Sequence, residues 1–133
     1  MKVLLIYPQY THSSEFDSRA PSMALFYLAA VLEKGGHQVR ILDASLGPVV
    51  KTGGVYRYGL SDAALADRLS TEDFDVAGIS CSFNARWQFV ARIARQVKDL
   101  WPGVPVAVGG LYPTSEWQRS EEHTSELQSR QSI

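Results

Sequence analysis

Residues 75–110 read DVAGISCSFNARWQFVARIARQVKDLWPGVPVAVGG, and this stretch decides the fold. Its first six residues form a short apolar run that is typical of a buried strand. Residues 85–101 repeat apolar side chains every three or four positions, which indicates a helix. Residues 104–108 form a second apolar run. A strand, a helix and a second strand in this order predict two parallel strands joined by a crossover helix.

The same alternation continues toward the N-terminus. Two further strands are expected over residues 2–7 and 37–43, and two further helices over residues 22–34 and 62–69. The first strand is expected at the centre of the sheet. The helix over residues 22–34 has hardly any polar face, so we expect it to pack against the sheet. Residues 9–20 and 44–60 are interpreted as loops.

This order predicts an α/β fold, a Rossmann-like or flavodoxin-like parallel sheet with helices on both faces. About four of the five strands of a complete sheet of this kind are expected. In such sheets ligands bind beyond the carboxyl ends of the strands, where the strand order reverses. Binding residues are therefore expected in residues 7–12, 43–46, 80–84 and 109–114.

Length and charge narrow the function classes. The 133 residues suffice for one domain with a modest core. The 13 basic and 14 acidic side chains leave a formal net charge of -1, which argues against nucleic-acid and membrane-surface partners. No apolar run reaches the ~18 residues of a membrane span, and the start does not resemble a secretory leader. We therefore expect a cytoplasmic protein.

The common phosphate-binding signatures are missing from the sequence. Neither the glycine-rich dinucleotide motif nor the P-loop motif occurs. A flavodoxin-like domain that holds flavin mononucleotide stays open, because Thr11, Ser13 and Ser14 would give a polar phosphate loop. The N-terminal domain of a nucleotide-sugar glycosyltransferase also stays open, with the region of Gly53 and Gly54 as its acceptor loop.

Small and hydroxyl-bearing residues follow the last two expected strands. Gly109 and Gly110 leave space for a bulky ligand to approach the backbone. Ser80 and Ser82 bring hydroxyl groups to the same rim, on either side of Cys81. The single cysteine has no disulfide partner and no evident histidine partner, so its favoured interpretation is a small buried hydrophobe.

Three segments together resemble the cobalamin-binding domain that precedes the catalytic domain in many radical S-adenosylmethionine enzymes. The first is residues 3–8, VLLIYP, which is similar to that family's opening strand and proline. The second is residues 21–39, PSMALFYLAAVLEKGGHQV, although Met23 and Ala24 stand where Leu-Gly is usual. The third is Ser80-x-Ser82, followed after 26 residues by Gly109–Gly110. It is similar to the Ser-x-Leu and Gly-Gly pair that lines the pocket for the nucleotide tail.

The resemblance implies that cobalamin binds with its tail between strands and its corrin ring on the loop tops. His12 lacks the Asp and Gly of the Asp-x-His-x-x-Gly motif that supplies a lower cobalt ligand in other cobalamin domains, so no metal ligand is expected. The cofactor-binding residues that we expect are Gln9, Tyr10, Ser80, Cys81, Ser82, Phe83, Gly109, Gly110 and Tyr112.

The resemblance also implies a partner, a radical domain C-terminal to this one. That domain would bind an iron-sulfur cluster and S-adenosylmethionine through a three-cysteine motif, and the present sequence has one cysteine. We therefore expect the cobalamin domain to be non-catalytic alone. The parent enzyme is expected to carry out methyl transfer or related radical chemistry.

Residues 119–133 differ in composition from the rest of the chain. Only Leu127 and Ile133 are aliphatic in this segment. Residues 119–129, RSEEHTSELQS, resemble the translation of a common sequencing-library adapter. We therefore expect a cobalamin-binding domain over residues 1–118, truncated at its C-terminal end, and an artefactual disordered tail over residues 119–133.

Overall fold

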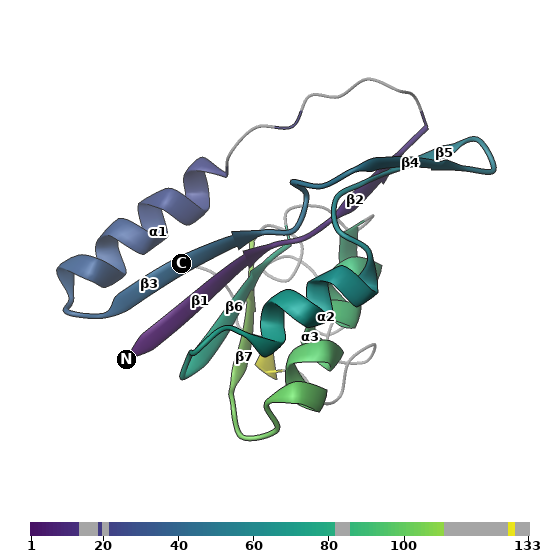
Figure 1. Cartoon of the computed structure of the whole chain (residues 1–133). Helices are drawn as coiled ribbons and strands as arrows, with labels where there is room; N and C mark the ends of the chain where they lie inside the picture. The colour runs from purple at the N-terminus through teal and green to yellow at the C-terminus, as the bar shows by residue number, and fades with distance from the viewer. Residues whose placement is uncertain (14–18, 20–21, 82–85, 111–127, 130–133) are drawn as a thin grey trace.

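Four parallel strands form the main sheet of the computed structural model, which describes residues 1–13, 19, 22–81, 86–110 and 128–129 (Figure 1). Their order is β3-β1-β6-β7, and a two-residue strand, β8, pairs in parallel with β7. The predicted parallel sheet is confirmed, and β1 lies inside it, between β3 and β6. The strands are β1 (Lys2–Tyr7), β3 (Gln38–Asp43), β6 (Val76–Ser80), β7 (Val106–Gly109) and β8 (Gln128–Ser129).

The described helices begin and end close to the predicted positions. They are α1 (Met23–Lys34), α2 (Asp62–Ser70) and α3 (Trp87–Leu100). Ser22 caps α1 by accepting a hydrogen bond from the Leu25 amide at 3.3 Å, and Ser61 caps α2 by accepting one from the Ala64 amide at 3.1 Å. Among the described residues, every helix is too short or too polar to cross a membrane.

The helices divide between the two faces of the sheet, as Figure 1 shows. Helices α2 and α3 cover one face, where strand residues such as Leu4, Ile79 and Val108 join a large buried core. Helix α1 lies on the other face, over β3 and β1, and packs there against Val3 and Leu5. Successive residues of a strand point to opposite faces, so β1, β3 and β6 contribute to both cores.

The surface of α3 is divided into an apolar face and a polar face, and this division determines how the helix packs. Its polar residues, including Arg92 and Arg95, stay on the outside. The Trp101 indole, just after the helix, donates a hydrogen bond to the Leu69 carbonyl of α2 at 3.1 Å and ties the two helices together. The buried residues of α3 are Trp87, Phe89, Val90, Ile93, Ala94 and Val97.

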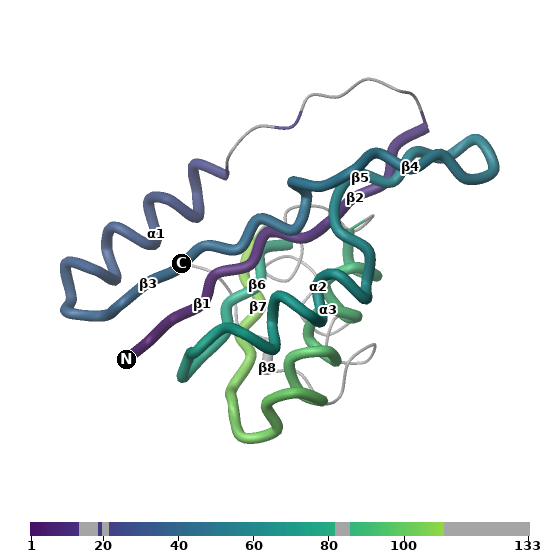
Figure 2. The backbone as a smooth tube through the Cα atoms, in the orientation of Figure 1, coloured from purple at the N-terminus to yellow at the C-terminus, as the bar shows by residue number. Residues whose placement is uncertain are grey.

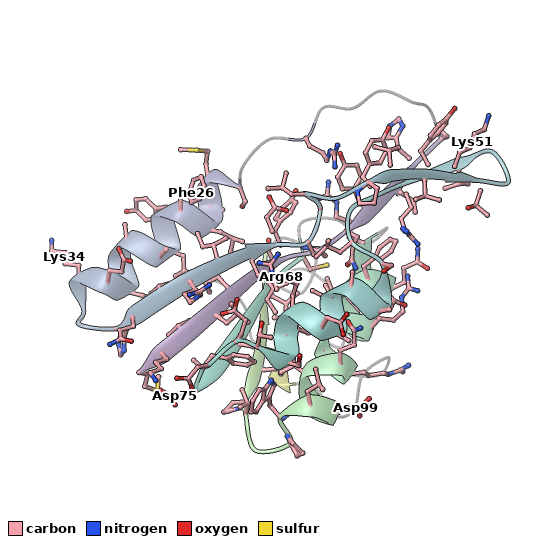
Figure 3. The ribbon with its side chains drawn as sticks, in the orientation of Figure 1. Phe26, Lys34, Lys51, Arg68, Asp75 and Asp99 are labelled. Atoms are coloured by element: carbon pink, nitrogen blue, oxygen red, sulfur yellow. The ribbon has the colours of Figure 1, made fainter. Side chains whose placement is uncertain are left out.

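Helix α1 is packed far less completely than its apolar sequence predicts. Leu25 is its one buried residue. Met23 and Tyr27 are 74% and 76% exposed, and Phe26, Leu28 and Val31 are exposed as well. In Figure 3, Phe26 is labelled about one turn after the start of this helix, and Lys34 is labelled at its end. The helix does contact the sheet as expected, but only along a narrow strip formed by Leu25, Ala29 and Leu32.

The expected loops over residues 9–20 and 44–60 contain a second sheet that the sequence analysis missed. It has three antiparallel strands in the order β2-β5-β4. Figure 2 shows β4 and β5 extending beyond the end of β3. The strands are β2 (Tyr10–His12), β4 (Val49–Thr52) and β5 (Val55–Tyr58).

The turn between β4 and β5 explains why this region is a hairpin. Gly53 and Gly54 have φ angles of 58° and 80°, and a two-residue turn with positive φ at both positions matches the twist of a hairpin. Val49, Val50 and Val55 on either side favour extended backbone. Glycine content alone therefore gave a wrong prediction for this segment.

Candidate functional site

Three neighbouring strands end together at one edge of the main sheet. Tyr7 ends β1, Ser80 ends β6 and Gly109 ends β7. β1 is followed along the chain by β3 on one side of it, and β6 then pairs with its other side, so the strand order reverses between β1 and β6. This carboxyl edge is where ligands bind in open parallel sheets.

A strip of small residues runs along β6 and β7 toward this edge. Gly78 pairs with Ala107, and Ser80 pairs with Gly109. These four residues, which we call the small-residue strip, alternate with the buried residues of the α3 side, so they face the α1 side of the sheet. All four are half-buried.

The small-residue strip is bordered by one larger side chain from β1. A Cβ built on Gly78 would lie 3.0 Å from the end of the Leu5 side chain. Leu5 is a flexible neighbour that can adjust by a few tenths of an ångström. Within the described part of β6 and β7, the strip residues carry no side chain larger than a hydroxymethyl group.

Gly110 is needed for a contact between two backbones. Its φ is 121°, and a Cβ at this position would lie 2.4 Å from the Cys81 carbonyl oxygen. The Cys81 amide also donates a hydrogen bond to the Gly109 carbonyl at 2.7 Å. The segments after β6 and β7 are thus held together at the carboxyl edge. This contact is a structural reason for glycine at position 110 that is independent of any ligand.

The structure brings Ser80 and Gly109 together but places the Cys81 side chain elsewhere. Ser80 faces the α1 side, whereas Cys81 is fully buried in the core beneath α2 and α3. The alternation of strand residues accounts for this separation. The environment of Cys81 therefore matches the small buried hydrophobe of the sequence analysis, and its thiol does not face the small-residue strip.

Gln9 and Tyr10 follow β1 at the same edge. Gln9 is 1% exposed, and its amide group donates a hydrogen bond to the Leu60 carbonyl at 3.0 Å. The Gln9 Oε1 atom is buried and has no hydrogen-bond partner. Tyr10 is half-buried and stacks on Tyr58 of β5, with 4.9 Å between the ring centroids and 10° between the planes.

Other predicted residues lie apart from this group or cannot be placed. Ser82, Phe83 and Tyr112 lie outside the described residues. His12 is exposed on β2, where it pairs with Tyr56. In the part of the chain that the structure describes, no three His, Cys, Asp or Glu side chains gather in an arrangement that could hold a metal ion.

Two arginines at the carboxyl edge, Arg19 and Arg86, are not predicted from the sequence. Arg86, just before α3, donates a hydrogen bond to the Tyr7 hydroxyl. Arg19 donates to the carbonyls of Ser45 and Gly47 at 2.9 and 2.6 Å and lies over the Tyr58 ring. These contacts join residues that are far apart in the chain, so a local sequence pattern does not predict them.

A depression of about 460 Å³ lies at the opposite, amino edge of the sheet. Four of the charged side chains that line it are paired with one another. Lys2 pairs with Asp73, and the Arg40 guanidinium lies 3.0 Å from the largely buried Glu72 carboxylate. It is also remote from the point where strand order reverses. The carboxyl edge with its small-residue strip therefore remains the candidate site.

Comparison with known proteins identifies the family of this chain. The sequence model of the B12-binding domain family matches residues 13–127. A methyltransferase from Streptomyces wedmorensis, cytidylyl-2-hydroxyethylphosphonate methyltransferase, is 32% identical over 118 residues, which cover 84% of this chain. The chain spans 22% of the length of that relative.

A solved structure shares the fold of this chain. It is the crystal structure of a novel cobalamin-binding protein from Desulfitobacterium hafniense DCB-2, with a TM-score of 0.63 and 11% sequence identity. The match covers 99% of this chain and 52% of that protein. At this identity the similarity concerns the fold alone.

Proposed function

Because the chain belongs to the B12-binding domain family, we propose that it holds cobalamin with the nucleotide tail along the small-residue strip and the corrin ring beyond the carboxyl edge. The observation that carries this proposal is the run of paired small residues, Gly78 with Ala107 and Ser80 with Gly109. They are half-buried on the side of the sheet opposite α2 and α3. The nucleotide tail of cobalamin carries a bulky planar base, which can lie against the sheet where the side chains are this small.

The residues present fit such a group. Ser80 would donate a hydrogen bond from its hydroxyl group to the tail, and the adjacent Gly109 would let the tail approach the backbone. Ser82, Phe83 and Tyr112 are proposed contacts from the sequence resemblance, together with Gln9 and Tyr10 at the end of β1. Cobalamin, when bound, supplies a cobalt ion that carries a methyl group or assists radical chemistry.

We further propose that the parent protein is a cobalamin-dependent radical S-adenosylmethionine enzyme. The methyltransferase relative supports methyl transfer as its reaction. A separate radical domain of the parent would hold the iron-sulfur cluster and S-adenosylmethionine. In this proposal the present domain binds and orients the corrinoid, and it is not catalytic alone.

The segment after residue 118 is proposed to be adapter-derived. The family match reaches residue 127, and β8 lies at residues 128–129. Sequencing the genomic gene beyond the codon for Gln118 tests the proposal. Codons other than those for residues 119–133 are expected, and native codons for RSEEHTSELQS would contradict the proposal.

Titration with hydroxocobalamin, followed by visible absorbance, tests the binding site. The chain with Ala107→Leu is expected to bind at least about tenfold more weakly, because the new side chain fills the strip. Ala63→Leu on the exposed face of α2 is the matched control and should bind like the unsubstituted chain. Equal affinity of the Ala107→Leu and Ala63→Leu chains would contradict the proposed tail position.

A parallel titration with flavin mononucleotide distinguishes the main alternative. Uptake of flavin without uptake of the corrinoid would favour the flavodoxin-like domain. A titration with a nucleotide sugar distinguishes the second alternative. Binding of the nucleotide sugar, with no binding of the corrinoid or the flavin, would favour the glycosyltransferase domain.

A further inference from the structure

Four side chains at the carboxyl edge form a continuous stack, which we call the tyrosine–arginine stack: Tyr7, Arg86, Tyr10 and Tyr58. The Arg86 guanidinium carbon lies 5.2 Å from the Tyr7 ring centroid and 4.8 Å from the Tyr10 ring centroid. Arg86 also donates a hydrogen bond to the Tyr7 hydroxyl. Tyr10 in turn stacks on Tyr58, which is fully buried.

The stack connects the two sheets of the molecule. Tyr7 ends β1 of the main sheet, whereas Tyr10 and Tyr58 belong to β2 and β5 of the three-stranded sheet. The two sheets are separate hydrogen-bonded ladders. Arg86 directly precedes α3, and the first residue of that helix, Trp87, is buried in the core. The backbone position of Arg86 is therefore fixed by α3. The stack therefore links the three-stranded sheet to both β1 and α3.

Arginine suits this position better than lysine. A planar guanidinium contacts aromatic rings over its face while its N–H groups still donate hydrogen bonds in the plane. The ammonium of lysine is a compact, strongly hydrated charge and cannot stack in this way. Arg86 uses both properties, since it contacts two rings and donates to one hydroxyl.

We propose that Arg86 is a positioning residue that fixes the three-stranded sheet against the carboxyl edge, so that β2 and the β4–β5 hairpin form a rigid rim beside the cofactor. The role of this rim in cofactor binding rests on the proposed function. The other claim, that Arg86 joins the two sheets, is independent of the proposed function, and we call it the mechanical part of the proposal. In this arrangement Arg86 acts through Tyr10 and holds its ring in one place.

Hydrogen exchange without cofactor tests the mechanical part. Arg86→Gln should speed amide exchange in β2 and β5 about tenfold, because the stack loses its guanidinium, while β1 and β6 keep their protection. The matched control is Arg92→Gln. Arg92 lies on α3, contacts the Phe89 ring at 4.8 Å and pairs with Asp62, so it makes similar interactions outside the stack. Arg92→Gln should leave β2 and β5 unchanged.

The conservative variant separates stacking from charge. Arg86→Lys keeps the positive charge and loses the planar group, so its β2 and β5 amides should exchange as fast as those of Arg86→Gln. Full protection in Arg86→Lys would overturn the role of stacking. Protection of β1 and β6, read in the same experiment, shows that each variant is folded. Unchanged exchange in β2 and β5 of Arg86→Gln would overturn the mechanical part.

Circular dichroism of bound hydroxocobalamin in the visible region tests the role in cofactor binding. Arg86→Gln should weaken binding about tenfold and change the dichroism of the bound corrinoid, because the rim no longer holds one position. Arg92→Gln should change neither. Faster exchange with unaltered affinity and dichroism would overturn the cofactor role alone. Failure of the unsubstituted chain to bind the corrinoid would overturn the proposed function, and exchange would still decide the mechanical part.

Discussion

Helices α1 and α3 lie on opposite faces of one sheet and differ in almost every physical respect. Helix α3 buries six side chains and keeps its charges outside. Helix α1 buries Leu25 alone and exposes Met23, Tyr27 and Val31. The comparison teaches that an apolar helix sequence does not by itself show how deeply the helix is buried. The division into polar and apolar faces, present in α3 and missing in α1, is the better guide.

The largest difference is expected for the same substitution made in each helix. Val97 on α3 is fully buried, whereas Val31 on α1 is 52% exposed. Val97→Ala should lower the free energy of unfolding by about 2–3 kcal/mol, because it removes buried methyl groups and leaves a cavity. Val31→Ala should stay within about 0.5 kcal/mol, since alanine also favours helix. Urea denaturation measures both free energies of unfolding, and equal losses for the two variants would contradict the difference in burial between Val97 and Val31.

A smaller effect is expected at the helix caps. Ser61→Ala and Ser22→Ala each remove one side-chain acceptor from a helix start, at a cost of about 1 kcal/mol. Helix α2 packs with α3 in the main core, so Ser61→Ala should lower global stability. Helix α1 is packed along one narrow strip, so Ser22→Ala should mainly speed amide exchange in its first turn. Hydrogen exchange with urea denaturation distinguishes local from global loss.

The smallest effect on the free energy of unfolding is expected at the exposed ion pair between Lys2 and Asp73, which lies outside α1 and α3. The Asp73 carboxylate accepts a hydrogen bond from Lys2 and raises the pKa of Lys2 above the ordinary 10.5. A group whose pKa is higher in the folded protein than in the unfolded chain stabilises the fold. This stabilisation is fully present below the unfolded-state pKa and is lost as pH rises through the folded-state pKa. The difference between Asp73→Asn and the unsubstituted chain should therefore be constant from pH 7 to 9 and shrink above 10.5. A difference that grows above 10.5 would contradict this assignment.

The main sheet could be predicted because its signals are local. β1, β6 and β7 are short, mainly apolar runs, β3 alternates polar and apolar residues, and each described helix has a periodic or capped sequence. The three-stranded sheet was missed because β2 pairs with β5, more than 40 residues away. One signal was nevertheless present. Two glycines flanked by β-branched residues at 49–56 are typical of a hairpin.

The candidate site could be predicted only in part. The rule for parallel sheets leads to the carboxyl edge, and the structure pairs Ser80 with Gly109 there. The alternation of strand residues would have separated the Ser80 and Cys81 side chains from sequence alone. The tyrosine–arginine stack could not be predicted, because Arg86 contacts Tyr7 and Tyr10 through side chains from separate parts of the chain.

The complete burial of Cys81 has a practical consequence for spectroscopy. The only native thiol is shielded from solvent, so maleimide dyes should react slowly with the folded protein. A cysteine introduced at exposed Thr52, beside the hairpin turn, would then accept a fluorophore selectively, with the native thiol left in place. Single-molecule fluorescence from that position would report the motion of the hairpin directly.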